Sequence, residues 1–140
     1  MTVFYDNPSE LGEPLGKYSH VSSTDGLVFV AGQVGIHGDG SLAGPDLPAQ
    51  MRQVFANIGA ALRSRGGGFR DVLKFTTYLT DSSLIAPFYE TREELFAQLY
   101  PEGEYPPNTL LVIDRLVRPE YLLEIEAIGH VATPQAADKT

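Results

Sequence analysis

The sequence predicts an α+β fold, a mixed β-sheet with two helices packed on one face. Apolar residues recur at helical spacing in only two stretches, 49–65 and about 85–100. The other ordered stretches are short and rich in β-branched and aromatic residues, which favours strands. The predicted order is β-β-β-α-β-α-β-β, and helices this sparse are expected to lie on one face of the sheet.

The N-terminal part of the chain is predicted to form three strands. Val3–Tyr5 is a short apolar stretch that is typical of an edge strand. Tyr18–Ser22 and Leu27–Val34 are predicted to pair as a hairpin. Asp25-Gly26 supplies the turn, because these residue types tolerate a positive φ. A long loop rich in glycine and proline follows.

Two helices flank a strand in the middle of the chain. The first helix, 49–65, is amphipathic and stops at the glycine run 66–68. Val72–Thr80 is rich in β-branched and aromatic residues and is predicted to be a strand. The second helix, about 85–100, ends where prolines and a glycine follow.

The closing run carries the most chemical information. Two β-prone segments, 110–116 and 123–128, flank a turn around Pro119 and are predicted to form a hairpin. Glu124 and Glu126 point to the same face of the last strand, because side chains alternate along a strand. Two neighbouring carboxylates cost free energy unless something neutralises or uses them.

The two faces of the last strand differ in character. One face is apolar and is expected to pack on the helices, with Leu123, Ile125 and Ala127. The other is half apolar and half acidic, with Leu122, Glu124, Glu126 and Ile128. Such a face is typical of an interface, so a closed homo-oligomer is expected.

Composition limits the classes of protein that fit. The 140 residues suit one domain, 1–140, and the chain has no cysteine for disulfide or thiolate chemistry. Its three histidines, His20, His37 and His130, lack metal-ligand spacing, and we expect neither a metal nor a cofactor. We see no signal peptide or membrane span, and expect a cytoplasmic protein. A net charge of −8 disfavours a general nucleic-acid binder.

Glu124 and Tyr18 are the candidate catalytic residues. Glu124 is able to act as a general base or to hold a water molecule. The alternative is a partly exposed acid paired with Arg115 or Arg118 on the neighbouring strand. Tyr18 starts the predicted hairpin and places a phenol in a cleft, unless it is an aromatic residue that only packs. Gly32 ends a strand. There it either lets a ligand approach the backbone N–H or marks a bulge or a tight crossing.

Several motifs together resemble the RidA/YjgF/UK114 family. The resemblance runs from about residue 18 to 131 and leaves 132–140 as a tail. It rests on the order and spacing of these motifs: Gly16-x-Tyr18, Val30-Ala31-Gly32-Gln33, the helix Gln50–Leu62, Phe75-Thr76-Thr77-Tyr78-Leu79-Thr80-Asp81, Pro107-x-Thr109 and Glu124-Ile125-Glu126-Ala127-Ile128. The family implies a chorismate mutase-like fold, a homotrimer and ligand clefts between subunits. Its best-known members hydrolyse reactive enamines and imines and release ammonia, and an older label is endoribonuclease.

The chain departs from the family at the substrate side of that cleft. Asn108 stands where deaminase-type members place an arginine that clamps a substrate carboxylate, and an amide lacks the charged fork of a guanidinium. Leu110 stands where a cysteine is common, Ala31 where a small polar residue is expected, and Tyr89 where an asparagine is expected. These four residues and Gly32 are the predicted substrate-binding set.

Glu124, Gly32 and Tyr18 are retained, and in the family the acid helps to hold the hydrolytic water. The resemblance therefore implies hydrolytic deamination of an enamine or imine, or hydrolysis of a related carbonyl-type metabolite. The substrate is expected to differ from a 2-imino acid because of Asn108. A non-catalytic, metabolite-binding or stress-associated trimer is the alternative. An endoribonuclease ranks third, because the chain is acidic and lacks a basic groove with aromatic residues.

Overall fold

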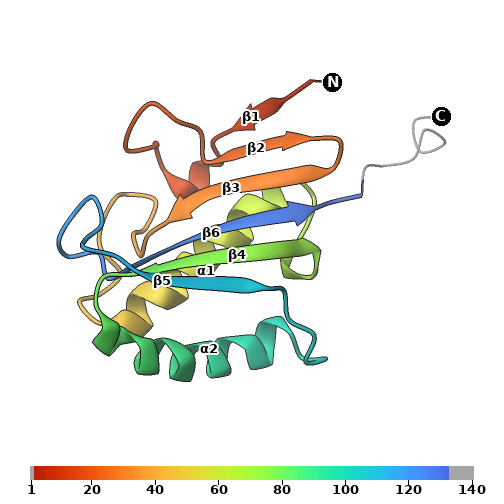
Figure 1. Cartoon of the computed structure of the whole chain (residues 1–140). Coiled ribbons are helices and arrows are strands. Elements are labelled where there is room, and N and C mark those ends of the chain that lie inside the picture. The colour runs from red at the N-terminus through yellow and green to blue at the C-terminus, as the bar shows by residue number, and fades with distance from the viewer. Residues whose placement is uncertain (1, 133–140) are drawn as a thin grey trace.

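The computed structural model describes residues 2–132, which form one six-stranded sheet with two long helices on the same face (Figure 1). Along the sheet the strands lie in the order β1-β2-β3-β6-β4-β5. The strands are β1 (Phe4–Asp6), β2 (Val21–Thr24), β3 (Leu27–Gln33), β4 (Val72–Leu79), β5 (Asn108–Val112) and β6 (Leu123–His130). The long helices are α1 (Leu47–Ser64) and α2 (Ile85–Leu99), and single turns of 3-10 helix are η1 (Ser9–Leu11), η2 (Phe69–Asp71) and η3 (Ser82–Leu84).

The sheet is mixed, as the sequence predicts. β4 and β5 run parallel, while every other neighbouring pair is antiparallel. The two parallel strands are joined through α2, and a helix in the connection is the usual way to bring two strands parallel. β4, α2 and β5 therefore form a βαβ unit.

The local signals for turns and helix ends are confirmed. Asp25 and Gly26 both have positive φ, 50° and 84°, which is the two-residue turn that matches the twist of a hairpin. α1 ends at Ser64, and Gly66 just beyond it has a φ of 82°. The N–H of Gly67 then bonds back to the carbonyl of Leu62 at 2.9 Å, so a free carbonyl of the last turn is satisfied.

The predicted hairpin between the last two strands is wrong. β5 pairs only with β4 and lies at the edge, whereas β6 lies between β3 and β4. Burial explains the arrangement, because Leu123 and Ile125 of β6 are fully buried and belong at the centre of the sheet. β5 is shorter and half of it is exposed, which suits an edge.

The side chain of Gln50 anchors the segment 113–122, which connects β5 to β6 and is called the crossing segment below. It is fully buried on α1. Its amide nitrogen donates to the carbonyls of Gly44 and Glu120, both at 3.0 Å. Its amide oxygen accepts from the N–H of Leu122 at 2.9 Å. This polar side chain on the apolar face of α1 thus satisfies backbone groups of two loops.

The core lies between the helices and the sheet. Leu123, Ile125 and Ala127 face α1, as predicted from the alternation along β6. The opposite face of the sheet carries no helix formed by residues 2–132 and is called the open face below (Figure 1). No helix in residues 2–132 is long and apolar enough to cross a membrane. The predicted tail, 132–140, falls outside the described residues except for its first position.

Candidate active site

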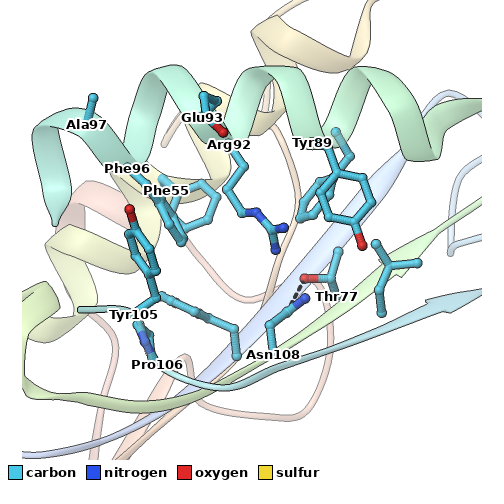
Figure 2. A pocket seen from close by; sticks show the side chains of 13 residues that line it. Phe55, Thr77, Tyr89, Arg92, Glu93, Phe96, Ala97, Tyr105, Pro106 and Asn108 are labelled. Atoms are coloured by element: carbon cyan, nitrogen blue, oxygen red, sulfur yellow. Dashed lines mark hydrogen bonds between the residues drawn. The ribbon is translucent and has the colours of Figure 1, made fainter. Parts of the chain in front are cut away.

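A cavity of about 560 Å³ lies between α2, the strands β4 and β5, and the loop that precedes β5 (Figure 2). Its wall is largely aromatic, with Phe55, Phe75, Phe88, Tyr89, Phe96 and Tyr105. Three polar side chains come together inside it, Thr77, Arg92 and Asn108. Aromatic walls with a few convergent polar groups are a usual form of a small-molecule site.

Asn108 is held in place by its neighbour on β4. The buried hydroxyl of Thr77 donates to the side-chain oxygen of Asn108 at 2.8 Å. This bond fixes the amide so that its NH₂ group remains as a donor for a ligand. Leu110 lies beside Thr77 in the parallel register and adds an apolar wall.

Arg92 brings a positive charge into the cavity from α2. Its guanidinium carbon lies 4.6 Å from the ring centroid of Tyr89 and 5.2 Å from that of Phe88. Figure 2 shows the guanidinium pointing from the helix towards Thr77 and Asn108. The sequence analysis missed this residue. A signal for it existed, because Phe88 and Arg92 are four residues apart and share one face of α2.

Glu124 lies on the open face of the sheet, half-buried beside Glu126. Burial, and then the charge of Glu126, raise the pKa of Glu124 above its ordinary value. Glu126 itself accepts a hydrogen bond from the phenol of Tyr78, and this bond raises the pKa of Tyr78. The two acids are therefore distinct, since one is tied to a phenol and the other has no such partner among the described residues.

The carboxyl group of Glu124 lies directly over Gly32. A Cβ atom at position 32 would stand 2.6 Å from a carboxyl oxygen of Glu124, closer than real Cβ atoms come to a non-bonded heavy atom. The register between β3 and β6 is also irregular between Val30 and Gln33, which fits the bulge that is one of the alternatives for Gly32. Ala31 lies in this irregular stretch, and its N–H bonds to the carbonyl of His20 at 2.8 Å.

Tyr18 precedes β2 instead of starting it. Its ring is 45% exposed and meets the ring of His20 edge-on, with centroids 6.1 Å apart. Its phenol oxygen accepts a hydrogen bond from the N–H of Leu15 at 3.3 Å. The phenol is thus held in a surface loop, outside the cavity of Arg92.

The model of the endoribonuclease L-PSP family matches residues 9–131. The chain belongs to this family. A RutC family protein of Pyrococcus horikoshii is 34% identical over 129 residues, which cover 91% of this chain and 95% of that protein. The resemblance to the RidA/YjgF/UK114 family is thereby confirmed.

Solved structures of the Rid family share the fold. RidA from the Antarctic bacterium Psychrobacter sp. matches with a TM-score of 0.76 at 29% identity, over 88% of this chain and 95% of that chain. A Rid family protein of unknown function from Yersinia pestis matches with a TM-score of 0.82 at 25% identity, over 93% of this chain and 100% of that chain. The chorismate mutase-like fold expected from the resemblance is this family's fold.

Within one chain, the RidA-like site residues divide between the two faces of the sheet. Glu124 stands opposite Tyr78 in the antiparallel register, so both point to the open face. Thr77 is the next residue on β4 and points the other way, into the cavity with Asn108. Within one chain, Tyr89 and Asn108 therefore lie on the other side of the sheet from Glu124. An inter-subunit cleft that joins the two faces stays a prediction.

The alternative pairing of Glu124 with an arginine on the neighbouring strand is wrong for this chain. Arg115 lies in the crossing segment and donates to the carbonyls of Leu116 and Val117 at 3.0 and 3.1 Å. The strand neighbours of Glu124 are β3 and β4, neither of which carries Arg115 or Arg118. The ion pairs found in residues 2–132 are Arg52–Glu94 and Arg63–Glu10.

Proposed function

We propose that this RidA-family chain hydrolyses an enamine or imine, or a related small carbonyl-type metabolite, in clefts between the subunits of a homotrimer. The observation that carries the proposal is the environment of Glu124. Its carboxyl group is half-buried, its pKa is raised, and it lies against a backbone position without a side chain. A carboxyl group whose pKa is moved towards neutrality is suited to both taking up and returning a proton.

In the proposed reaction Glu124 activates a water molecule. The water oxygen bonds to the carbon of the C=N group while its proton passes to the carboxylate, and the π electrons of the C=N bond move to nitrogen. Glu124 then returns the proton to that nitrogen. The remaining hydroxyl next passes its proton through Glu124 to the same nitrogen, and the C–N bond breaks as the hydroxyl oxygen becomes a carbonyl oxygen. An imine and water thus give a carbonyl compound and ammonia. No redox partner is needed.

The remaining predicted residues serve binding in this proposal. Tyr18 reaches the cleft from a surface loop and orients the water or the nitrogen with its phenol. The backbone at Ala31 and Gly32 contacts the ligand near Glu124. Asn108, with the neighbouring Tyr89 and Leu110, receives the rest of the ligand, and its neutral amide lacks the charged fork with which an arginine at this position would hold a carboxylate.

A binding protein without turnover is the second candidate. It is favoured by the completeness of the cavity within one chain and by the sheet that separates it from Glu124. A ribonuclease activity has less support, since the net charge of −8 opposes contact with a phosphate backbone.

Ammonia release from a panel of imines, generated in situ from amino acids, tests the proposal. Glu124→Gln keeps the shape and removes the charge, and is expected to lower turnover by about 10²-fold or more. Glu126→Gln is the matched control, since that acid is bonded to Tyr78 and is expected to retain activity within about tenfold. Absence of turnover of the whole panel by the wild type favours the binding protein.

A further inference from the structure

Arg92 has no part in the proposed hydrolysis, yet it is placed like a ligand-binding residue. It is half-buried in the cavity, and the ion pairs of residues 2–132 engage other arginines. The acid beside it that also lines the cavity, Glu93, is its exposed neighbour in sequence. Adjacent residues of a helix do not face each other, so Glu93 is poorly placed to neutralise the guanidinium.

We propose that Arg92 is the anion-binding residue of this cavity, and that the ligand is a small monocarboxylate carrying a flat apolar group. This inference rests on the proposed function for the identity of the site and adds the class of ligand.

The aromatic rings around Arg92 hold its guanidinium in place and leave its N–H groups able to bind a carboxylate. Rings attract a guanidinium through its flat face and hold it without consuming its N–H donors. The Tyr89 and Phe88 rings lie within 4.6 and 5.2 Å of the guanidinium carbon. The N–H groups at the edge of the guanidinium therefore remain for a carboxylate, which they bind in a two-point contact.

A second donor lies on the opposite wall. The side-chain oxygen of Asn108 is occupied by the hydroxyl of Thr77, so its NH₂ group is the part that is left for a ligand. Figure 2 shows the guanidinium and this amide converging on the same space. One cation with one neutral donor suits a single negative charge better than a dianion.

The rest of the cavity indicates a flat apolar group on the ligand. Phe96 and Tyr105 stack with centroids 5.9 Å apart and line one end of the cavity, and Leu110 lines the β5 side. Its volume of about 560 Å³ lies in the range of sites for molecules much larger than a three-carbon acid. An aromatic group on the carboxylate would contact these rings in the offset or edge-on arrangements they favour.

Calorimetric titration of the full chain with phenylpyruvate, pyruvate, benzoate and benzamide tests the inference. Phenylpyruvate is expected to bind at least about tenfold more tightly than pyruvate, and benzoate at least about tenfold more tightly than its neutral amide. Arg92→Gln is expected to weaken phenylpyruvate binding by about 10- to 100-fold and to leave benzamide unchanged. Arg92→Lys keeps the charge without the fork and is expected to give an intermediate loss.

Arg63→Gln is the matched control, because it removes the same charge from an exposed arginine paired with Glu10 away from the cavity. It is expected to bind all four compounds like the wild type. Equal binding of phenylpyruvate by the wild type and both Arg92 variants overturns the inference, as does equal binding of benzoate and benzamide. Arg92-dependent binding without turnover of any imine leaves the inference standing and removes the proposed function. Imine turnover together with carboxylate binding that is unchanged in the Arg92 variants leaves the proposed function standing and removes the inference.

Discussion

The contact between Glu124 and Gly32 is the tightest constraint at the candidate site. The glycine is not required by its backbone angle. It is required by space, because the carboxyl group of Glu124 occupies the volume in which a side chain would stand. The atoms that clash belong to the far end of a flexible side chain, so they are able to move without unfolding the strand.

Gly32→Ala is therefore expected to fold and to displace the acid. Turnover of any substrate that the wild type accepts is expected to fall by about 10²-fold, similar to removal of the base. Ammonia release and thermal unfolding, measured side by side, check this. Gly40→Ala is the control for a glycine with nothing near its added Cβ atom, although its φ of 88° adds some strain. A Gly32→Ala variant with full activity would show that the position of Glu124 does not matter.

The raised pKa of Glu124 predicts a pH-dependent effect on stability. Burial and Glu126 favour the protonated form in the folded state, so the unfolded chain releases this proton at lower pH than the folded chain does. The stability contributed by the group is thus present at low pH and is lost as the pH rises through the folded pKa. Glu124→Gln is expected to raise Tm at pH 7, and the gain is expected to vanish below the ordinary carboxyl pKa of 4.5.

Unfolding curves of wild type and variant between these pH values provide the measurement. Glu126→Gln serves as the comparison, because its loss breaks the bond from Tyr78 instead of relieving a buried charge. A lower Tm for Glu124→Gln at pH 7 would indicate that a cation of another subunit pairs with Glu124 across an interface.

At this scale the sequence singled out Glu124 and Gly32, which the structure places against each other, and it did not point to Arg92. Glu124 and Gly32 carry signals that do not depend on tertiary contacts, namely a second acid on the same strand face and a glycine at a strand end. Arg92 becomes notable only when the cavity around it is known, because an arginine on a helix is usually a solvated residue. Tyr18 was placed on a strand, whereas its loop is held by the backbone of Leu15.

The elements of the chain were predictable from periodicity, and so was the pairing of β2 with β3 across its two-residue turn, but the pairing of the last two strands was not. Each of the eight expected elements exists within a few residues of its predicted bounds. The position of β6 between β3 and β4 depends on contacts far apart in sequence. Proximity along the chain favoured a hairpin of the last two strands, but the burial of β6 and the βαβ connection through α2 decided otherwise.

Gln50 of α1 is hydrogen-bonded to the crossing segment between β5 and β6. The variant Gln50→Leu tests whether these bonds stabilise the fold. The substitution leaves two backbone carbonyls and one N–H without their partner. We expect a loss of about 3 kcal/mol in the free energy of unfolding, or roughly 10 °C in Tm. Gln98→Leu changes the same groups at an exposed position of α2 and is expected to shift Tm by less than about 2 °C. Thermal unfolding of both variants decides whether the buried amide has this role.

At the scale of the whole molecule, the open face is the surface expected to assemble. Phe29 on β3 stands opposite Ile128 on β6, and its side chain is 42% exposed in a single chain. Apolar side chains beside acids on a sheet without a covering layer suit contact with another copy. The homotrimer remains a prediction, and the fold of the family makes this face the place to test it.

Phe29→Glu adds a third acid to that face and is expected to convert the trimer to monomers at micromolar concentration, because like charges would meet in the interface. Light scattering measures the mass directly. Gln98→Glu adds the same charge on α2 and is expected to remain trimeric. A wild type that scatters as a monomer would remove both the trimer and the inter-subunit cleft.

The division of the site between two faces of the sheet also determines how assemblies that mix different subunits would behave. If a cleft takes Glu124 from one polypeptide and the cavity from the next, each subunit contributes to two clefts, with a different half in each. A subunit that carries Glu124→Gln then inactivates the one cleft to which it contributes residue 124 and leaves the other clefts of the trimer active. Co-refolding it with subunits whose cavity is blocked, when both variants are inactive alone, would restore function in about a quarter of the clefts by random assortment. When wild-type subunits are mixed with one such variant, activity would fall in direct proportion to the fraction of variant subunits, so neither variant would inactivate a whole trimer.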